Sequence, residues 1–391
     1  MQLEGAKSRV GGKVLISSVG ERVEAYLPPP LPPHPPVNLE ALCFKLERAN
    51  LALGRLDGMA AILTDIPISL HIFVRQEVLF SSQIEGIQSS LSDLLLFEIN
   101  SAPGIPLNDV QEVSNYVAAM NHGLERIAGD FPLSQRLMRE MHQILLSRGR
   151  GSTKSPGNFR RSQNWIGGTR PGNALYVPPP PDYVPDLMSN LEQFIHTDQP
   201  GLTTLIKSGL MHVQFETIHP FLDGNGRLGR LLITLFLCSS GLLRHPILYL
   251  SFYFKTHKSY YYELLQRVRT HGDWETWLEF FLDGVISTSE HATETARKIL
   301  RLFDEDHKRI KQSKKRAASA LLVHQIFQER PLLPVPYAAK NAGISLPTAY
   351  SAIRHLQDMG IVREITGKKK NRIFVYHEYW QILNKEIESA A

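Results

Sequence analysis

Residues 219–230 read HPFLDGNGRLGR, and they separate two apolar stretches with helical spacing, 201–219 and 227–243. Three glycines fall within this short segment, a density that would destabilise the interior of a helix. The pattern therefore predicts a helix, a tight turn at Gly224-Asn225-Gly226, and a second helix that begins at Arg227.

The turn and the helix after it are suited to binding an anion. Successive backbone N–H groups of a glycine turn can face one anion, and the helix N-terminus adds donors and the positive end of the helix dipole. Arg227 and Arg230 are three residues apart, so they share one helix face. Because guanidinium groups bind phosphate oxygens in bidentate fashion, the segment predicts a phosphate site.

His219 and Asp223 add reactive groups to this site. Pro220 forces the chain out of the first helix directly after His219, and an imidazole there can accept a proton from an incoming hydroxyl. A carboxylate beside a phosphate site usually binds Mg²⁺, as Asp223 would. Together these groups suit displacement at a nucleotide phosphorus. The alternative is a helix–loop–helix joint with a buried histidine and surface arginines.

The sequence around this segment predicts a mainly α protein. Besides the two helices above, apolar periodicity predicts helices over 38–56, 74–100, 107–128, 133–148, 184–196, 257–269 and 274–302. One interruption, 166–181, reads IGGTRPGNALYVPPPP and predicts a small β-hairpin around a Pro-Gly-Asn turn. Before the first helix, 26–36 reads YLPPPLPPHPP, a polyproline II arm that either straps the fold or binds a proline-recognising module.

A second module is predicted at the C-terminal end. The basic run 307–316 predicts a linker, followed by a helix over 317–328. Helices over 337–341 and 345–359, with Ser345 as N-cap of the second, resemble a helix-turn-helix. Strands over 361–366 and 372–376 would complete a winged helix.

This module has two open interpretations, DNA binding and protein or dimer packing. The candidates for phosphate contacts in the wing are Lys368, Lys369, Lys370 and Arg372. The candidates for base contacts are Thr348, Tyr350 and Arg354.

Composition is that of an ordinary globular protein. The chain has 391 residues, 43% of them apolar and 21% charged, with a formal net charge of +5. That charge is too small to indicate nucleic-acid binding by itself. The start of the chain lacks an apolar signal-peptide core, the apolar runs are too short to span a bilayer, and the two cysteines do not suggest a disulfide framework. We expect a cytoplasmic protein without a membrane partner.

Residues 219–230 resemble the signature of the Fic family, HPFx(D/E)GNGRxxR, and match it at every defined position. The resemblance implies a Fic helical bundle with the hairpin as a flap, an N-terminal helical extension and a C-terminal winged helix. The expected parts are 1–105, with the proline-rich arm, the Fic core 106–290, a helix and basic linker 291–316, and the winged helix 317–391. The implied activity is transfer of AMP from ATP, with Mg²⁺, to Ser, Thr or Tyr hydroxyls of proteins.

The resemblance also implies roles for single residues. His219 would be the general base, Asp223 the Mg²⁺ ligand and Phe221 the buried anchor of the loop. The residues implied to bind ATP are Gly224, Asn225, Gly226, Arg227, Leu228, Gly229 and Arg230. Because the Doc-type branch, which phosphorylates, carries Lys in place of Gly226, the glycine implies that ATP exposes its α-phosphate.

Residues 81–86, SSQIEG, resemble the family's inhibitory motif (S/T)xxxE(G/N) through Ser81, Glu85 and Gly86. The resemblance implies that Glu85 pairs with Arg230 and occupies the place of the γ-phosphate. By itself, a single glutamate on a helix is usually solvated. In some relatives this glutamate directs water to remove AMP, so removal activity is an alternative.

Substrate contacts are expected at the flap and at one tyrosine. Asn173, Leu175 and Tyr176 would register a target segment by β-strand addition, unless the hairpin only covers the core. Tyr261 would stack on adenine, unless it packs in the core. The expected partners are a protein with an exposed hydroxyl, the chain itself, a second copy, or DNA. The rival functions are a DNA-binding regulator with a ligand-sensing Fic core and another Fic transfer chemistry.

Overall fold

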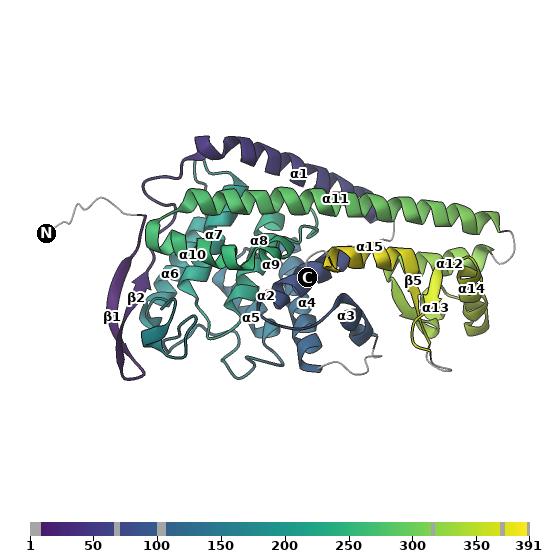
Figure 1. Ribbon diagram of the computed structural model, residues 1–391, viewed down its shortest axis with the longest axis horizontal. Coiled ribbons are helices and arrows are strands. Elements are labelled where there is room, and N and C mark those ends of the chain that lie inside the picture. Colours follow the sequence, from purple (N-terminus) through teal and green to yellow (C-terminus); the bar gives the residue numbers. More distant parts are fainter. Residues whose placement is uncertain (1–8, 66–70, 100–106, 314–316, 368–371, 389–391) are drawn as a thin grey trace.

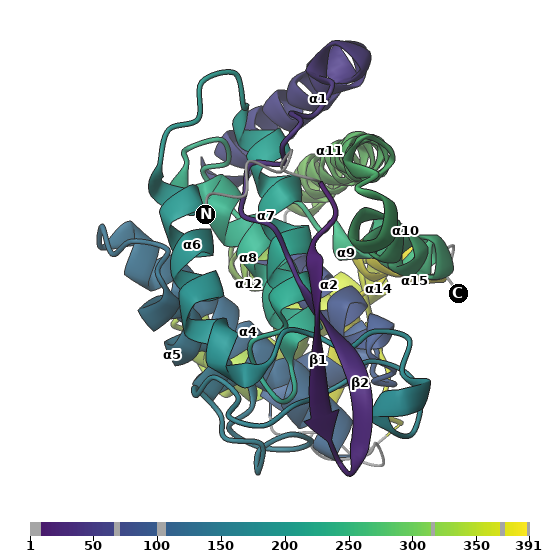
Figure 2. The ribbon, with the colours of Figure 1, turned by 90° about the vertical axis from the view of Figure 1, so that its left-hand side faces the viewer.

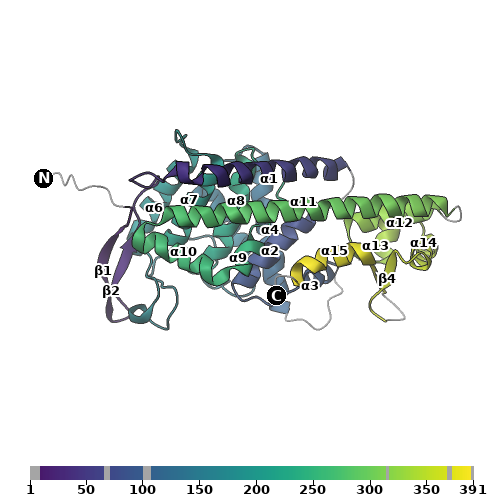
Figure 3. The same ribbon diagram turned by 45° about the horizontal axis from the view of Figure 1, so that its top comes forward.

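The structure is a computed structural model that describes residues 9–65, 71–99, 107–313, 317–367 and 372–388. A helical body and a smaller C-terminal domain lie side by side, and one long helix, α11 (Trp274–Gln312), runs along both (Figure 1). The helix α1 (Leu39–Asp65) lies next to α11, and Figure 3 shows the two together on one side of the body.

The body is built around α7 (Thr204–Ile218) and α8 (Asn225–Ser239), the two helices on either side of 219–224. Nearly every residue of both is buried, so they form the centre of the apolar core. The surrounding helices are α2 (His71–Ile84), α3 (Leu91–Glu98), α4 (Leu107–Ala128), α5 (Gln135–Leu145), α6 (Val184–His196), α9 (Ser251–Thr256) and α10 (Lys258–His271).

The predicted helix 74–100 is wrong as a single element. Its first part ends at Ile84, and Gly86 has a φ of +86°, a conformation that glycine adopts without strain. Its second part begins after Ser90, whose hydroxyl accepts from the backbone N–H of Asp93 while the Asp93 carboxylate accepts from the N–H of Ser90. The break places Glu85 at the end of α2, not on a continuous helical face.

An N-terminal β-hairpin was not predicted from the sequence. Strands β1 (Gly12–Ser18) and β2 (Glu21–Leu27) pair antiparallel, with Gly12 opposite Leu27. The turn between them has positive φ at Val19 and Gly20, the backbone form that fits a two-residue hairpin. Figure 2 shows this hairpin across one end of the body.

The predicted flap hairpin is reduced to one β-bridge, between Ile166 and Tyr176, with a 3₁₀ turn at Pro171–Asn173. The N-terminal hairpin packs against it. The Tyr26 N–H donates to the Val177 carbonyl at 3.0 Å, and Val23, Ala25 and Val177 form a small apolar cluster.

The expected linker 307–316 is wrong where it is described, because α11 continues to Gln312. Lysine, arginine and glutamine are good helix formers, and Asp306 and Ile310 are buried. Tyr376 of the C-terminal domain donates a hydrogen bond to Asp306 at 2.8 Å. The last turns of α11 are therefore part of the attachment of that domain.

The C-terminal domain follows the predicted element order with two additions, the strand β3 and the last helix, α15. Its elements are α12 (Ala317–Glu329), β3 (Leu332–Pro334), α13 (Val335–Asn341), α14 (Leu346–Asp358), β4 (Val362–Glu364), β5 (Ile373–Tyr376) and α15 (His377–Glu388). The strands form an antiparallel sheet in the order β3-β5-β4. The N-cap at Ser345 is confirmed. The wing candidates Lys368, Lys369 and Lys370 lie outside the described residues.

Glu98, at the end of α3, connects this domain to the body. Its carboxylate pairs with Arg75 of α2 and with Arg330 just after α12, both at 2.8 Å. The three side chains are 15–19% exposed.

In the described part of the chain, none of the helices is long and apolar enough to cross a membrane.

Candidate active site

The loop between α7 and α8 is held by side chains from distant parts of the chain. His219 has a φ of +50° and ends α7. The buried Arg160 donates from Nε to the His219 carbonyl at 2.9 Å and from its backbone N–H to the Pro220 carbonyl at 2.9 Å. Arg160 therefore fixes the backbone that carries the imidazole.

Phe221 and Asn225 close the loop on itself. The Asn225 side chain accepts from the Phe221 N–H at 2.9 Å and donates to the Phe221 carbonyl at 2.8 Å. Phe221 is fully buried and stacks on His142, with ring centroids 3.7 Å apart. Nε2 of His142 donates to the Asp223 carbonyl at 2.9 Å, since its Nδ1 accepts from the Gly157 N–H. Both polar atoms of the Asn225 side chain are thus engaged in holding the loop closed.

Asp223 and the turn after it begin α8. Gly224 has a φ of +77°, and the Asp223 carboxylate accepts from its N–H at 2.6 Å. Asp223 Oδ1 also lies 3.7 Å from Nη2 of Arg227. The Asp223 side chain is 27% exposed, so an ion can reach it from solvent.

Arg227 is buried and only partly engaged. Its side chain is 1% exposed, and Nη1 donates to Oε2 of Glu112 at 3.0 Å. Among the described residues, its buried Nε and Nη2 find no hydrogen-bond partner. Buried donors of this kind are costly, so this edge of the guanidinium is the feature of the site that most plainly fits an anion.

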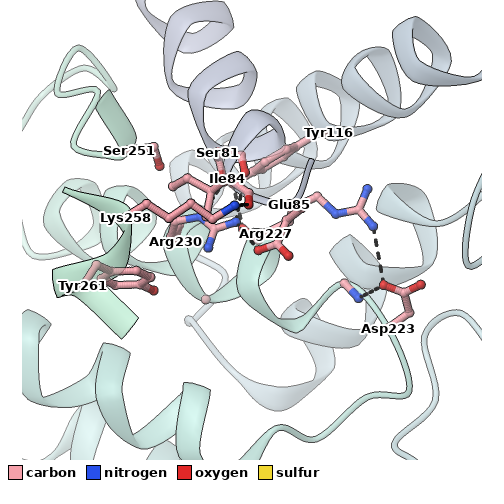
Figure 4. A network of polar contacts seen from close by, with 12 residues as sticks. Ser81, Ile84, Glu85, Tyr116, Asp223, Arg227, Arg230, Ser251, Lys258 and Tyr261 are labelled. Carbon is pink, nitrogen blue, oxygen red and sulfur yellow. Dashed lines mark hydrogen bonds and ion pairs between the residues drawn. The ribbon is translucent and has the colours of Figure 1, made fainter. Parts of the chain in front are cut away.

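Arg230 is engaged by the end of α2 (Figure 4). Nη2 donates to Oε1 of Glu85 at 2.7 Å and to the Ser81 carbonyl at 3.0 Å, while Nε donates to the Ser81 hydroxyl at 2.8 Å. A Cβ at Gly226 would lie 2.4 Å from Oε1 of Glu85. The glycine therefore leaves the space in which the carboxylate lies against the first turn of α8.

A hydrogen-bond chain ties this contact to Arg227. The Ser81 hydroxyl lies 3.0 Å from the Tyr116 hydroxyl, which donates to the Arg227 carbonyl at 2.7 Å. Lys258 of α10 donates to the Ile84 carbonyl at 2.6 Å, at the end of α2. The position of Glu85 is thus fixed by α4, α8 and α10 together.

Two pKa shifts set the charges in the site. Burial, with Arg160 and Arg269 nearby, lowers the pKa of His219 to about 3, so the imidazole is neutral at neutral pH. Burial raises the pKa of Glu85, but Arg230 outweighs burial and leaves that pKa below its ordinary value. The site therefore holds a neutral imidazole and an ionised carboxylate.

Two further carboxyl groups near Arg230, Glu77 and Glu216, are fully buried. Burial raises the pKa of each to about 7. Glu77 accepts from the Ser251 N–H at 2.9 Å and from the Ser251 hydroxyl. A Cβ at Gly229 would lie 2.4 Å from Glu216, and Leu228 is buried in the core. Gly229 and Leu228 therefore pack α8 against its neighbours.

The residues expected to contact substrate have mixed surroundings. Tyr261 is fully buried and its hydroxyl lies 2.9 Å from Nε2 of His212, which favours the core-packing alternative. Tyr176 is also buried and donates to the Thr217 carbonyl at 2.6 Å. Asn173 caps its own turn by accepting from the N–H groups of Thr169 and Arg170. Leu175 is 79% exposed.

The residues at this site fit a nucleoside triphosphate with Mg²⁺. Arg227 offers buried donors that make no hydrogen bond among the described residues, and the Glu85 carboxylate already lies where an anion would meet Gly226 and Arg230. Asp223 carries carboxylate oxygens, the type of ligand that Mg²⁺ prefers. Sequence reasoning missed Arg160, His142 and Glu112. For Glu112 the sequence did carry a signal of burial. It lies four residues before Tyr116, so the carboxylate shares one helix face with that aromatic ring.

Two family models match the chain. The one described as "Fic/DOC family N-terminal" matches residues 43–125, and the one described as "Fic/DOC family" matches residues 132–237. The second contains the whole segment 219–230, and the first contains 81–86.

Curated relatives share this region. Proteins named protein adenylyltransferase Fic from Aedes aegypti and Culex quinquefasciatus are each 30% identical, over 213 and 244 residues. These matches cover 53% and 61% of this chain, but 39% and 45% of those proteins. The chain thus spans less than half the length of these relatives.

Solved structures share the fold. A Fic family protein from Desulfovibrio desulfuricans G20 has a TM-score of 0.56 at 20% identity and covers 85% of this chain and 95% of its own. A Fic domain containing signaling protein from Bacteroides thetaiotaomicron has a TM-score of 0.50 at 19% identity, over 64% of this chain and 97% of its own.

Proposed function

The chain belongs to the Fic/DOC family, and on that premise we propose that it is an autoinhibited protein adenylyltransferase. It would transfer AMP from ATP to a hydroxyl side chain of a protein and release pyrophosphate. The observation that carries the proposal is the buried edge of Arg227 beside a neutral His219. Among the described residues this edge makes no hydrogen bond, and its only ion-pair neighbour is Asp223, 3.7 Å from Nη2. The relatives named protein adenylyltransferase support it.

His219 would act as the general base. Its Nδ1 is buried, so Nε2 is the nitrogen that can face a hydroxyl. Nε2 would accept the proton while the hydroxyl oxygen forms a bond to the α-phosphorus and the bond from that phosphorus to the pyrophosphate oxygen breaks. A low pKa keeps the imidazole unprotonated and ready for this role.

The other residues would bind and orient the phosphates. Arg227 and Arg230 would hold the departing phosphates, and the N-terminus of α8 would add backbone donors. Mg²⁺, when bound at Asp223, would supply charge neutralisation for the leaving pyrophosphate. Because the two arginines would hold the departing phosphates, the α-phosphate would lie nearer His219.

Glu85 would inhibit the enzyme by occupying the γ-phosphate's place. Its carboxylate takes the Nη2 donor of Arg230 and fills the space above Gly226. A triphosphate that meets an ionised carboxylate there would bind with its α-phosphate out of line. Removing the Glu85 side chain should therefore raise the transfer rate.

Intact-mass spectrometry tests the proposal. Purified Glu85→Gly protein is incubated with Mg²⁺ and ATP, and we expect a mass increase of one AMP on the protein itself. The matched control is the same protein with His219→Ala, which should stay unmodified. If the Glu85→Gly protein gains no AMP, and adding protein extract yields no modified target, the proposed function is wrong.

One observation favours a second role, binding of duplex DNA by the C-terminal domain. Thr348, Tyr350 and Arg354 are all exposed on α14, the helix that the element order offers to a groove. A mobility-shift assay at two salt concentrations tests this role, because phosphate contacts weaken as salt rises. No shift at low salt would exclude it.

A further inference from the structure

Glu112, on α4, is 4% exposed, and each of its carboxylate oxygens accepts a hydrogen bond from a different part of the site. Oε2 accepts from Nη1 of Arg227 at 3.0 Å, and Oε1 accepts from the Arg150 N–H at 2.8 Å. A carboxylate this deep is unfavourable unless it is paired and hydrogen-bonded. The role of Glu112 therefore depends on the two groups that donate hydrogen bonds to it.

The first group is the guanidinium of Arg227. A guanidinium carries five N–H donors in a rigid plane, so fixing Nη1 fixes the direction of the others. The opposite edge, Nε and Nη2, is buried and makes no hydrogen bond among the described residues, and Nη2 lies 3.7 Å from Oδ1 of Asp223, the expected metal ligand. These two nitrogens are spaced to bind an oxyanion in bidentate fashion. Glu112 thus sets the plane in which Arg227 meets a phosphate.

The second group is the loop after α5. Besides the bond from Arg150 to Glu112, Asn115 of α4 donates to the Arg148 carbonyl at 2.9 Å. Gly149 lies so close that a Cβ there would be 2.7 Å from Cγ of Glu112. The same loop reaches Asp223, since a Cβ at Gly151 would lie 3.0 Å from Oδ2 of that carboxylate. Through this loop, Glu112 also supports the expected metal ligand.

We propose that Glu112 is a positioning residue for the phosphate-binding side of the site. It orients Arg227 directly and braces, through the loop 148–151, the side of the site that carries Asp223. This inference rests on the proposed function, and it assigns Glu112 no direct contact with substrate.

The test compares Mg²⁺-ATP binding in variants that share the Glu85→Gly change. Glu112→Gln removes the charge but keeps the size, and Glu125→Gln changes an exposed carboxylate on the same helix as the matched control. Calorimetry should show the Kd of Glu112→Gln raised roughly tenfold or more, as expected from one weakened charge-assisted hydrogen bond. The KM for ATP should rise with it, kcat should change less, and the control should match its parent.

A second variant separates positioning from packing. Glu112→Asp keeps the charge but shortens the side chain, so positioning predicts that aspartate restores more ATP affinity than glutamine. A role in packing alone predicts the reverse order, because glutamine is closer in size, and that result would overturn the inference. An unchanged Kd in Glu112→Gln would do the same. If the parent itself neither binds Mg²⁺-ATP nor gains AMP, the proposed function fails first.

Discussion

Replacing Glu85 by glycine should raise the rate of AMP transfer by a factor that depends on the strength of the Glu85–Arg230 ion pair. The Glu85 and Arg230 side chains meet at 2.7 Å, with Arg230 1% and Glu85 27% exposed. Two unit charges about 4 Å apart attract by about 4 kcal/mol at the effective dielectric near a protein surface, and desolvation offsets part of that. If about 2–3 kcal/mol remains as the barrier that Glu85 adds, the transfer rate rises roughly 30- to 150-fold.

The assay is self-labelling with ATP carrying radioactive α-phosphate, read as initial rate. Glu85→Gln is the informative companion, because it removes the charge and keeps most of the volume. Since glycine removes both, it should exceed glutamine, and glutamine should exceed the wild type. Equal labelling of wild type and Glu85→Gly would refute the assignment of Glu85 as the inhibitory group.

Three further outcomes are expected. Ser81→Ala removes the hydroxyl that accepts from Nε of Arg230, and the loss of about 1 kcal/mol should raise self-labelling roughly fivefold; no change would show that the carboxylate alone positions the arginine. The ion pair between Glu85 and Arg230 should persist at neutral pH. The pKa of Glu85 is below its ordinary value, so the carboxylate stays ionised and the pair is lost only as pH falls through that lowered pKa. Inhibition that disappears near pH 7 in an activity profile would contradict this. Glu98→Gln weakens both of its arginine contacts and should lower the Tm in calorimetry by a few degrees, about 1–2 kcal/mol, whereas an unchanged Tm would show that these pairs contribute nothing.

The sequence predicted the arrangement of the candidate site where its parts are close in the chain. His219, Asp223, Arg227 and Arg230 lie within one loop and the first two turns of α8, so spacing alone brings them together. The contact between Glu85 and Arg230 joins residues 145 positions apart, and only the family resemblance suggested it. Local pattern cannot supply such a pairing, because it depends on how α2 packs on α8.

The parts that were missed depend on tertiary packing in the same way. Glu112 meets Arg227 across 115 positions and His142 meets the Asp223 carbonyl across 81. The helix prediction over 74–100 failed because apolar periodicity continues through a break that Gly86 makes. The linker prediction failed because charged residues also form good helices when a neighbouring domain buries one face.

The proposed reaction moves the α-phosphate with its adenosine, not the γ-phosphate. The most direct measurement incubates Glu85→Gly protein with ATP labelled on either the α- or the γ-phosphate, with Glu85→Gly/His219→Ala as the control. The Glu85→Gly protein should retain α-label and no γ-label, and the control should retain neither. Retention of γ-label would indicate phosphoryl transfer, and α-label in the control would show that His219 is not the base.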